Sequence, residues 1–269
     1  MNFRTDLALE NTAPSKQTKT VEDGCTVTRI KDGNATYITM EVKALSDNID
    51  SGNTLLKQIA KELAALLPPK GTVLAAGLGN RGVTPDALGP LAAERVLATR
   101  YIKGELARVT GLENLRAVAV VSPGVLGTTG IEASEVIKAV VEEIKPSAVV
   151  AVDALAARSP SRLGCTVQIS SVGISPGAGV GNARPRIDES TLGVPVVSMG
   201  IPTVVDAATL ASDLLGKDAP DEVSPRGASM MVTPREIDLI ISRGARLLGM
   251  AINCAVNPSL TVEEFSELT

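Results

Sequence analysis

The chain has 269 residues, 44% of them apolar, and a net charge of −4. It contains no histidine, which excludes Ser-His-Asp and Cys-His hydrolysis and zinc sites of the His-Glu-x-x-His kind. The acidic balance gives no basic field for nucleic acid, and two Phe with two Tyr are too few for base-stacking platforms. We therefore expect no direct contact with nucleic acid, and we expect any hydrolytic chemistry to depend on carboxylates.

Two further features predict the compartment. The three cysteines, Cys25, Cys165 and Cys254, are odd in number and widely spaced, a pattern typical of reduced thiols in a cytoplasm-like compartment. The first twenty residues are polar, and no apolar run approaches the ~20 residues that a membrane helix requires. The sequence predicts a soluble, cytoplasmic protein that does not contact a membrane.

The N-terminal part is expected to form a leader, a hairpin and a helix. Residues 1–22 lack sustained periodicity and are predicted to be a mobile leader. The region at about 22–45 is predicted to be a β-hairpin, because two alternating stretches flank the turn-forming residues 31–34. A helix at about 54–67 should end at Pro68.

From Gly71 onward, apolar runs and amphipathic stretches alternate, which predicts buried strands separated by helices. Thr129 and Glu132 have the spacing of a capping box, and Thr233 and Glu236 repeat it before a last long helix. This order predicts an α/β fold with a mostly parallel twisted sheet and helices on both faces, and with the hairpin as an edge or a small subdomain. The strands are expected at about 72–76, 117–121, 147–153, 165–170 and 194–199, and the helices near 85–101, 131–144, 204–215 and 233–256.

Two aspartates follow predicted strands. Asp86 lies just past the strand at 72–76, and Asp153 ends the apolar run 148–152. A charged residue at the end of a buried strand is costly unless it is paired, hydrogen-bonded, protonated or functional, and ligands of open α/β sheets bind at strand ends. Both are candidate functional residues, although Asp86 also suits the first turn of a helix, where it complements the dipole.

Two glycine-rich loops allow a different interpretation. Residues 77–82 match G-x-G-x-x-G after a predicted strand, which would suggest a dinucleotide site. The helix is expected to start only after the third glycine, however, and no acidic residue closes a second strand about twenty residues later. Residues 175–182 form the second loop, whose backbone could approach a ligand closely or form an ordinary turn. A nucleotide-binding α/β module without proteolytic activity therefore stays open as the alternative.

Seven blocks, in order, resemble the germination protease, or spore protease, family of endospore-forming bacteria. The resemblance runs from Arg4 to about Val256, and seven ordered blocks are far more specific than one motif. These blocks are Gly77–Asn80, Thr84–Pro90, Pro123–Glu132, Asp153–Ser159, Gly179–Asn182, Gly200–Ala207 and Met231–Asp238.

The resemblance implies an endopeptidase that initiates degradation of small acid-soluble spore proteins during germination, in the cytoplasm of the forespore or spore core. It also implies a self-processing zymogen, a homotetramer, and a fold similar to the hydrogenase maturation proteases. The proposed catalytic pair of the family corresponds to Asp86 and Asp153. Two close carboxylates would share one proton and need no cofactor. A divalent metal is the alternative mechanism, held by these two residues with Glu132 or Asp206.

The resemblance also predicts a processing site. Family substrates are cut after an acidic residue and before a large apolar residue followed by Ala, and residues 5–8 have this form. We therefore expect a cut between Asp6 and Leu7, with residues 1–6 as the pro-segment and 7–269 as a single α/β protease domain. The region 216–229 is shorter than in the family. Candidates for substrate contacts or the oxyanion are Gly77, Gly79, Asn80, Arg158, Gly177 and Gly179, with Arg184 and Arg186 as further candidates for binding the acidic side chain.

Overall fold

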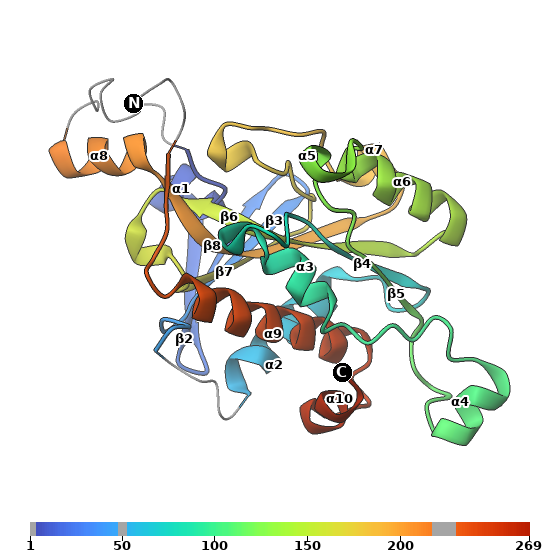
Figure 1. The fold of residues 1–269 in the computed structure, drawn as a ribbon. Coiled ribbons are helices and arrows are strands. Elements are labelled where there is room, and N and C mark those ends of the chain that lie inside the picture. The colour runs from blue at the N-terminus through green and yellow to red at the C-terminus, as the bar shows by residue number, and fades with distance from the viewer. Residues whose placement is uncertain (1–3, 48–52, 217–229) are drawn as a thin grey trace.

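The computed structural model describes residues 4–47, 53–216 and 230–269. The described residues form one nine-stranded sheet with helices on both faces (Figure 1). The strand order is β1-β2-β3-β7-β8-β6-β4-β5, and β9 pairs with β8. The strands are β1 (Gln17–Glu22), β2 (Cys25–Asp32), β3 (Ala35–Glu41), β4 (Val73–Gly77), β5 (Val118–Val121), β6 (Ala148–Ala157), β7 (Thr166–Ser170), β8 (Val196–Asp206) and β9 (Met231–Val232).

Ten α-helices occur among the described residues, and several are only one turn long. They are α1 (Ala8–Asn11), α2 (Thr54–Leu66), α3 (Leu88–Ala93), α4 (Gly104–Thr110), α5 (Leu126–Thr129), α6 (Ala133–Ile144), α7 (Glu189–Leu192), α8 (Ala207–Leu215), α9 (Ile237–Val256) and α10 (Val262–Leu268). Short 3-10 helices occur as well, of which Thr84–Asp86 and Ala178–Val180 matter for the site.

The sheet is mixed, so the expectation of a mostly parallel sheet was wrong. β4, β5, β6 and β8 run parallel to their neighbours in this group. The pairs β1–β2, β2–β3, β3–β7, β7–β8 and β8–β9 are antiparallel. The cause is the predicted hairpin: its strands β2 and β3 do not form a separate subdomain but extend the central sheet through β7.

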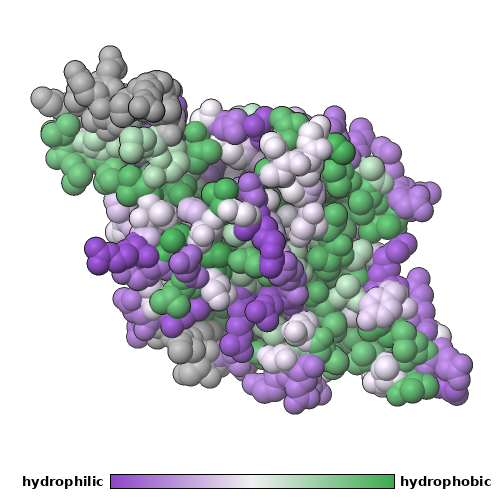
Figure 2. Space-filling view, in the orientation of Figure 1, coloured by the Kyte–Doolittle hydropathy of each residue, from purple (hydrophilic) through white to green (hydrophobic). Residues whose placement is uncertain are grey.

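Both faces of the central strands β4, β6 and β8 are buried, as predicted, whereas the edge strand β1 is largely exposed. Successive residues of a strand point to opposite faces, and along β6 Val150 and Val152 pack with α2, α3 and α9, whereas Val149 and Ala151 pack with α6. This explains why the central strands are continuous apolar runs. On the outside, α8 projects from the body and presents an apolar surface (Figures 1 and 2), on which Leu214 and Leu215 are exposed.

The N-terminal segment is part of the fold, and the prediction of a mobile leader was wrong for residues 4–22. α1 and β1 lie within it, and β1 pairs with β2 along its whole length. Leu7 and Leu9 are buried in a small cluster with Ile30 and Val205. Because this stretch is polar overall, nothing in the sequence indicated that these two leucines are buried. Their burial holds the segment against the rest of the protein. The first half of the predicted pro-segment, residues 1–3, lies outside the described residues, as does most of the shortened region 216–229.

β6 and β8 are longer than predicted, and this determines where the site lies. β6 was expected to end at Asp153 but continues to Ala157, because β8 extends beside it. β4, on the other side, ends at Gly77 opposite Val152. β6 therefore runs past the end of β4, and its edge beyond Val152 is open to other partners.

The helices were predicted with mixed success. α2, α6 and α9 are close to the expected ranges, but the helix expected at 85–101 is only the 3-10 helix Thr84–Asp86 followed by α3. The chain leaves the helical path where the backbone N–H of Leu97 donates to Oδ1 of Asn253, at 2.9 Å. Glu132, not Thr129, caps α6, in a capping box with Glu135.

The last predicted cap is also absent, and the helix that follows is more apolar than expected. The hydroxyl of Thr233 donates to the carbonyl of Thr203 instead of capping α9. Contrary to the expectation about apolar runs, α9 is long and apolar enough to cross a membrane by length and composition. Because 67% of its apolar stretch is buried in the protein, α9 is a core helix here.

Candidate active site

Three aspartates line one cavity of about 490 Å³ at the open edge of β6. Asp86 reaches it from the loop after β4, Asp153 from β6, and Asp6 from the N-terminal segment. The structure thus brings the predicted pair Asp86 and Asp153 together, although they are distant in sequence. It adds a third carboxylate, and this one belongs to the predicted processing bond.

Asp86 is held by the glycine loop that precedes it. The backbone N–H of Asn80 donates to its Oδ2 at 2.7 Å. Gly79 has a φ of +110°, and a Cβ there would lie 2.1 Å from the backbone oxygen of Asp86, so the loop can approach this closely only with glycine. Burial raises the pKa of the Asp86 carboxyl, and the hydrogen bond from Asn80 partly offsets this effect.

Of the three carboxyls, that of Asp153 has the most strongly shifted pKa. It is 6% exposed, and its Oδ1 accepts a hydrogen bond from the backbone N–H of Ala154 at 2.9 Å. Burial, then the negative charge of Asp86 and then that of Asp6, raise its pKa well above the usual range. The pKa of Asp86 is raised as well, but that of Asp153 is raised further, because Asp153 is more deeply buried and faces two negative charges.

Asp6 lies along the edge of β6 like a short added strand. Its backbone N–H donates to the carbonyl of Ala156 at 2.9 Å, and its Oδ2 accepts the N–H of Ala156 at 2.8 Å. Gln168 fixes the next peptide: its Nε2 donates to the carbonyl oxygen of Asp6 at 2.8 Å, and its Oε1 accepts the N–H of Ala8 at 2.7 Å. Both ends of the predicted processing bond are thus held in place.

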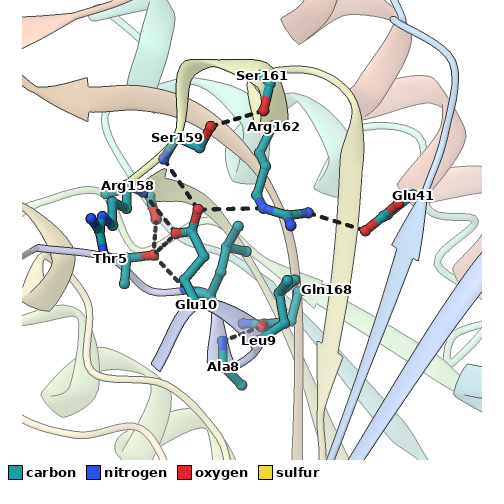
Figure 3. Close-up of polar contacts among 12 residues, drawn as sticks. Thr5, Ala8, Leu9, Glu10, Glu41, Arg158, Ser159, Ser161, Arg162 and Gln168 are labelled. Atoms are coloured by element: carbon teal, nitrogen blue, oxygen red, sulfur yellow. Dashed lines mark hydrogen bonds and ion pairs between the residues drawn. The ribbon is translucent and has the colours of Figure 1, made fainter. Parts of the chain in front are cut away.

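Glu10 anchors the segment just after this bond (Figure 3). Its carboxylate accepts the backbone N–H groups of Arg158 and Ser159, at 2.7 and 3.1 Å, and pairs with Nε of Arg162 at 3.3 Å. The hydroxyl of Thr5 donates to the same carboxylate. The side chain of Glu10 is only 7% exposed, so this ion is well shielded.

Sequence reasoning missed Gln168 and Glu10, for different reasons. Gln168 is a buried polar residue in the apolar strand β7, and such a residue is a recognisable signal because a buried amide needs partners. Glu10 carries no comparable signal, since it stands in a polar stretch of sequence. Its importance appears only when the segment docks on residues about 150 positions away.

The other candidate residues differ in where they lie and in which residues they contact. Gly77 is structural, since a Cβ there would lie 2.3 Å from the carbonyl oxygen of Gly89. Arg158 forms an ion pair with Asp213 at 2.7 Å, and Arg186 pairs with Asp188 at 2.6 Å.

The remaining candidates lie at the cavity or next to it. Arg184 lines the cavity and pairs with Glu132 at 3.5 Å. Gly177 lines it as well, with a φ of +73°. The backbone N–H of Gly179 donates to the carboxylate of Asp6.

The four carboxylates of the metal hypothesis do not form a ligand set. Asp206 caps α8 through the N–H and hydroxyl of Thr209, at 2.9 and 3.0 Å, and pairs with Arg4. Glu132 is occupied as the cap of α6. The described residues contain no group of three or more Asp, Glu or Cys side chains placed to hold a metal ion.

The first glycine loop does not suit a nucleotide. Binding of a pyrophosphate needs free backbone N–H groups, but those of Leu78, Asn80 and Gly82 are already bonded, to Val152, Asp86 and the Asn80 side chain. Three carboxylates facing the cavity would also repel a phosphate anion. The geometry favours a site for a peptide strand.

Comparisons with known proteins point in the same direction. A profile of the germination protease family matches residues 10–217. The chain is 36% identical to a germination protease of Clostridium perfringens (strain 13 / Type A), over 99% of this chain and 98% of the relative. It is 37% identical to one of Caldanaerobacter subterraneus subsp. tengcongensis, over 100% and 98%, and 35% identical to one of Bacillus pumilus (strain SAFR-032), over 84% and 78%.

Proposed function

The chain belongs to the germination protease family of peptidases, and we propose that it is the endopeptidase that initiates degradation of small acid-soluble spore proteins. We propose further that it is a zymogen that removes its own residues 1–6. The observation that carries this proposal is the position of Asp6–Leu7: this peptide bond belongs to a segment that enters the cavity containing Asp86 and Asp153.

We propose an aspartic mechanism without a metal cofactor. Asp86, in its ionised form, takes a proton from a water molecule, and the resulting hydroxide attacks the carbonyl carbon of the scissile bond. Asp153, in its protonated form, donates a hydrogen bond to the carbonyl oxygen, and when the tetrahedral intermediate collapses it transfers this proton to the leaving amine. Asp86 then carries the proton taken from water, and its return to Asp153 restores the starting state. Both carboxyls have a raised pKa, and the larger rise at Asp153, which is more buried and faces two negative charges, supports its role as the proton donor.

Self-processing provides the direct test. The full chain is incubated at mildly acidic pH, and its mass is followed with time. We expect loss of residues 1–6 in the natural chain, and no loss in the Asp86→Asn and Asp153→Asn variants, which should keep their fold. Processing at a near-normal rate in either variant would remove that residue from the mechanism.

Treatment with a chelator distinguishes the aspartic mechanism from the metal mechanism. Processing should continue after exhaustive treatment with EDTA, because the described carboxylates do not converge on a metal site. Loss of processing that is restored by adding back a divalent ion would establish the metal mechanism instead.

Titration of the protein with NAD and ATP tests the nucleotide-binding alternative. We expect no binding, and saturable binding would favour that alternative.

We also propose that the protein acts as a homotetramer in the cytoplasm of the forespore or spore core, without contacting a membrane or nucleic acid directly. Family membership supports this assembly and location, and the exposed leucines on α8 supply an apolar surface of the kind that subunits bury. Sedimentation of the purified protein should give four times the chain mass of 27.7 kDa. A monomer at all concentrations would contradict the assembly.

A further inference from the structure

The carboxylate of Asp6 is bound by backbone groups alone. It accepts the N–H of Ala156 at 2.8 Å and also the N–H of Gly179. Burial raises the pKa of the Asp6 carboxyl, and the hydrogen bonds from Ala156 and Gly179 partly offset this effect. Among the described residues, no lysine or arginine forms an ion pair with this carboxyl. The arginines suggested by the sequence therefore do not bind this carboxylate.

Gly179 closes this small pocket from the other side. A Cβ at this position would lie 2.3 Å from Oδ2 and 2.5 Å from Cγ of Asp6, which is far inside van der Waals contact. The three nearest atoms to such a Cβ all belong to the Asp6 carboxylate. Gly179 does not have a positive φ, so its backbone conformation does not require glycine. The contact with Asp6 does.

We propose that the N–H groups of Ala156 and Gly179 form the subsite that selects an acidic side chain before the scissile bond, and that Gly179 determines its shape. This inference rests on the proposed proteolytic function and extends it from the chain's own segment to protein substrates. A substrate backbone would be aligned by hydrogen bonds to the edge of β6. The subsite would then bind the side chain that occupies the position of Asp6.

The chemistry of the donors explains the selection. A carboxylate has two oxygens that only accept hydrogen bonds, so it can satisfy two converging N–H groups. An amide side chain is neutral, and its single oxygen is a weaker acceptor for these N–H groups than an ionised carboxylate. An ionised Asp is therefore preferred over Asn without any cationic side chain.

Self-processing of the full chain tests the subsite. Asp6→Asn and Gly179→Ala should each slow processing at least about tenfold relative to the natural chain. Ala178→Ser is the matched control, because it also adds one heavy atom, in the same 3-10 helix, but at an exposed position. Its rate should be unchanged. Processing of Asp6→Asn or Gly179→Ala at the natural rate would overturn the inference.

A stability measurement tests the same contact without activity. In the Asp153→Asn background, which should stay uncut, Gly179→Ala should destabilise the chain when Asp6 is present and much less when Asp6 is replaced by alanine. Equal effects in both backgrounds would show that Gly179 does not act on the carboxylate. If the natural chain does not process itself but this coupling is present, the proposed function fails while the binding pocket stands.

Discussion

The carboxyl of Asp153 combines burial with two negative neighbours, and this predicts an unusual dependence of stability on pH. Because its pKa is raised in the folded state, the fold holds this proton more tightly than the unfolded chain. The stabilising contribution is complete below the unfolded pKa and is lost as pH rises through the folded pKa. An asparagine at this position does not titrate, so the difference between the two proteins should grow with pH.

We therefore expect Asp153→Asn to be the more stable of the two at pH 8 and to lose this advantage near pH 4. Urea unfolding at both pH values measures the difference. The comparison is best made between Asp86→Asn and Asp86→Asn/Asp153→Asn, since neither should cut itself. In this background burial and Asp6 still raise the pKa of Asp153. A difference that does not change with pH would contradict the prediction.

Gln168 should act as a positioning residue for the bond that is cut. Gln168→Glu keeps the acceptor for the N–H of Ala8 but loses the donor to the carbonyl oxygen of Asp6. Since a single donor to a developing oxyanion typically contributes about 10²–10³ in rate, we expect self-processing to slow by at least about tenfold. Mass spectrometry against time gives the rate.

Two measurements separate this role from a structural one. On an external peptide, the Gln168→Glu variant should lose mainly kcat and retain KM, because the lost bond strengthens in the transition state. Gln168→Ala removes both bonds and should change kcat and KM together. An unchanged kcat in Gln168→Glu would show that the amide only supports the fold.

At the scale of elements, α1 and the preceding turn depend on Glu10. Replacing Glu10 with alanine leaves the N–H groups of Arg158 and Ser159 and the guanidinium of Arg162 without this acceptor. A single hydrogen bond to a charged group contributes about 1.5–3 kcal/mol, so we expect the free energy of unfolding to fall by at least this amount, or the segment to detach locally. Chemical unfolding and limited proteolysis after residue 11 distinguish these results.

Glu113→Ala provides the control, because Glu113 is exposed and surface substitutions usually stay within about 0.5 kcal/mol. Equal stability of the Glu10→Ala and Glu113→Ala variants, with equal resistance to protease, would show that Glu10 does not hold the segment.

The elements also show what a sequence can and cannot predict. α2 and α9 carry complete apolar faces, and the hairpin has a turn signal, so local pattern was sufficient for all three. The sequence could not predict that β6 continues beyond Asp153, because a charged residue after an apolar run normally marks the end of a strand. The strand continues only because it pairs with β8. The short α3 depends on Asn253, a residue more than 150 positions away, which no local pattern contains.

At the scale of the whole molecule, one part of the site could be predicted from the sequence and another part could not. The loop after β4 and the strand β6 could be expected to meet, since parallel strands end at one edge of a sheet. That Asp6 also lies there depends on how the N-terminal segment docks, through Leu7, Gln168 and Glu10. These contacts join the N-terminal segment to residues about 150–160 positions later in the chain and have no periodic signature.

The position of this segment predicts competition with external peptides. In the Asp153→Asn background, a chain that begins at Leu7 should bind a fluorescent peptide of residues 1–12, whereas the full chain should bind it at least tenfold more weakly, because its own Arg4–Asp6 lies along β6. Fluorescence anisotropy measures both affinities. Equal affinities would show that the segment does not block the cavity.

The complete burial of Leu7 has a consequence for the direction of the reaction. Its backbone N–H donates to the hydroxyl of Thr5 at 3.0 Å, on the far side of the cut. Hydrolysis would turn this neutral amide into a primary amine with a pKa of about 7.7–8.0, in an apolar setting and with its acceptor on the departing hexapeptide. The new ammonium therefore needs another acceptor in place of Thr5, either water or the nearby carboxylate of Glu10. Once it has moved, the two new ends are no longer held in position to re-form the bond.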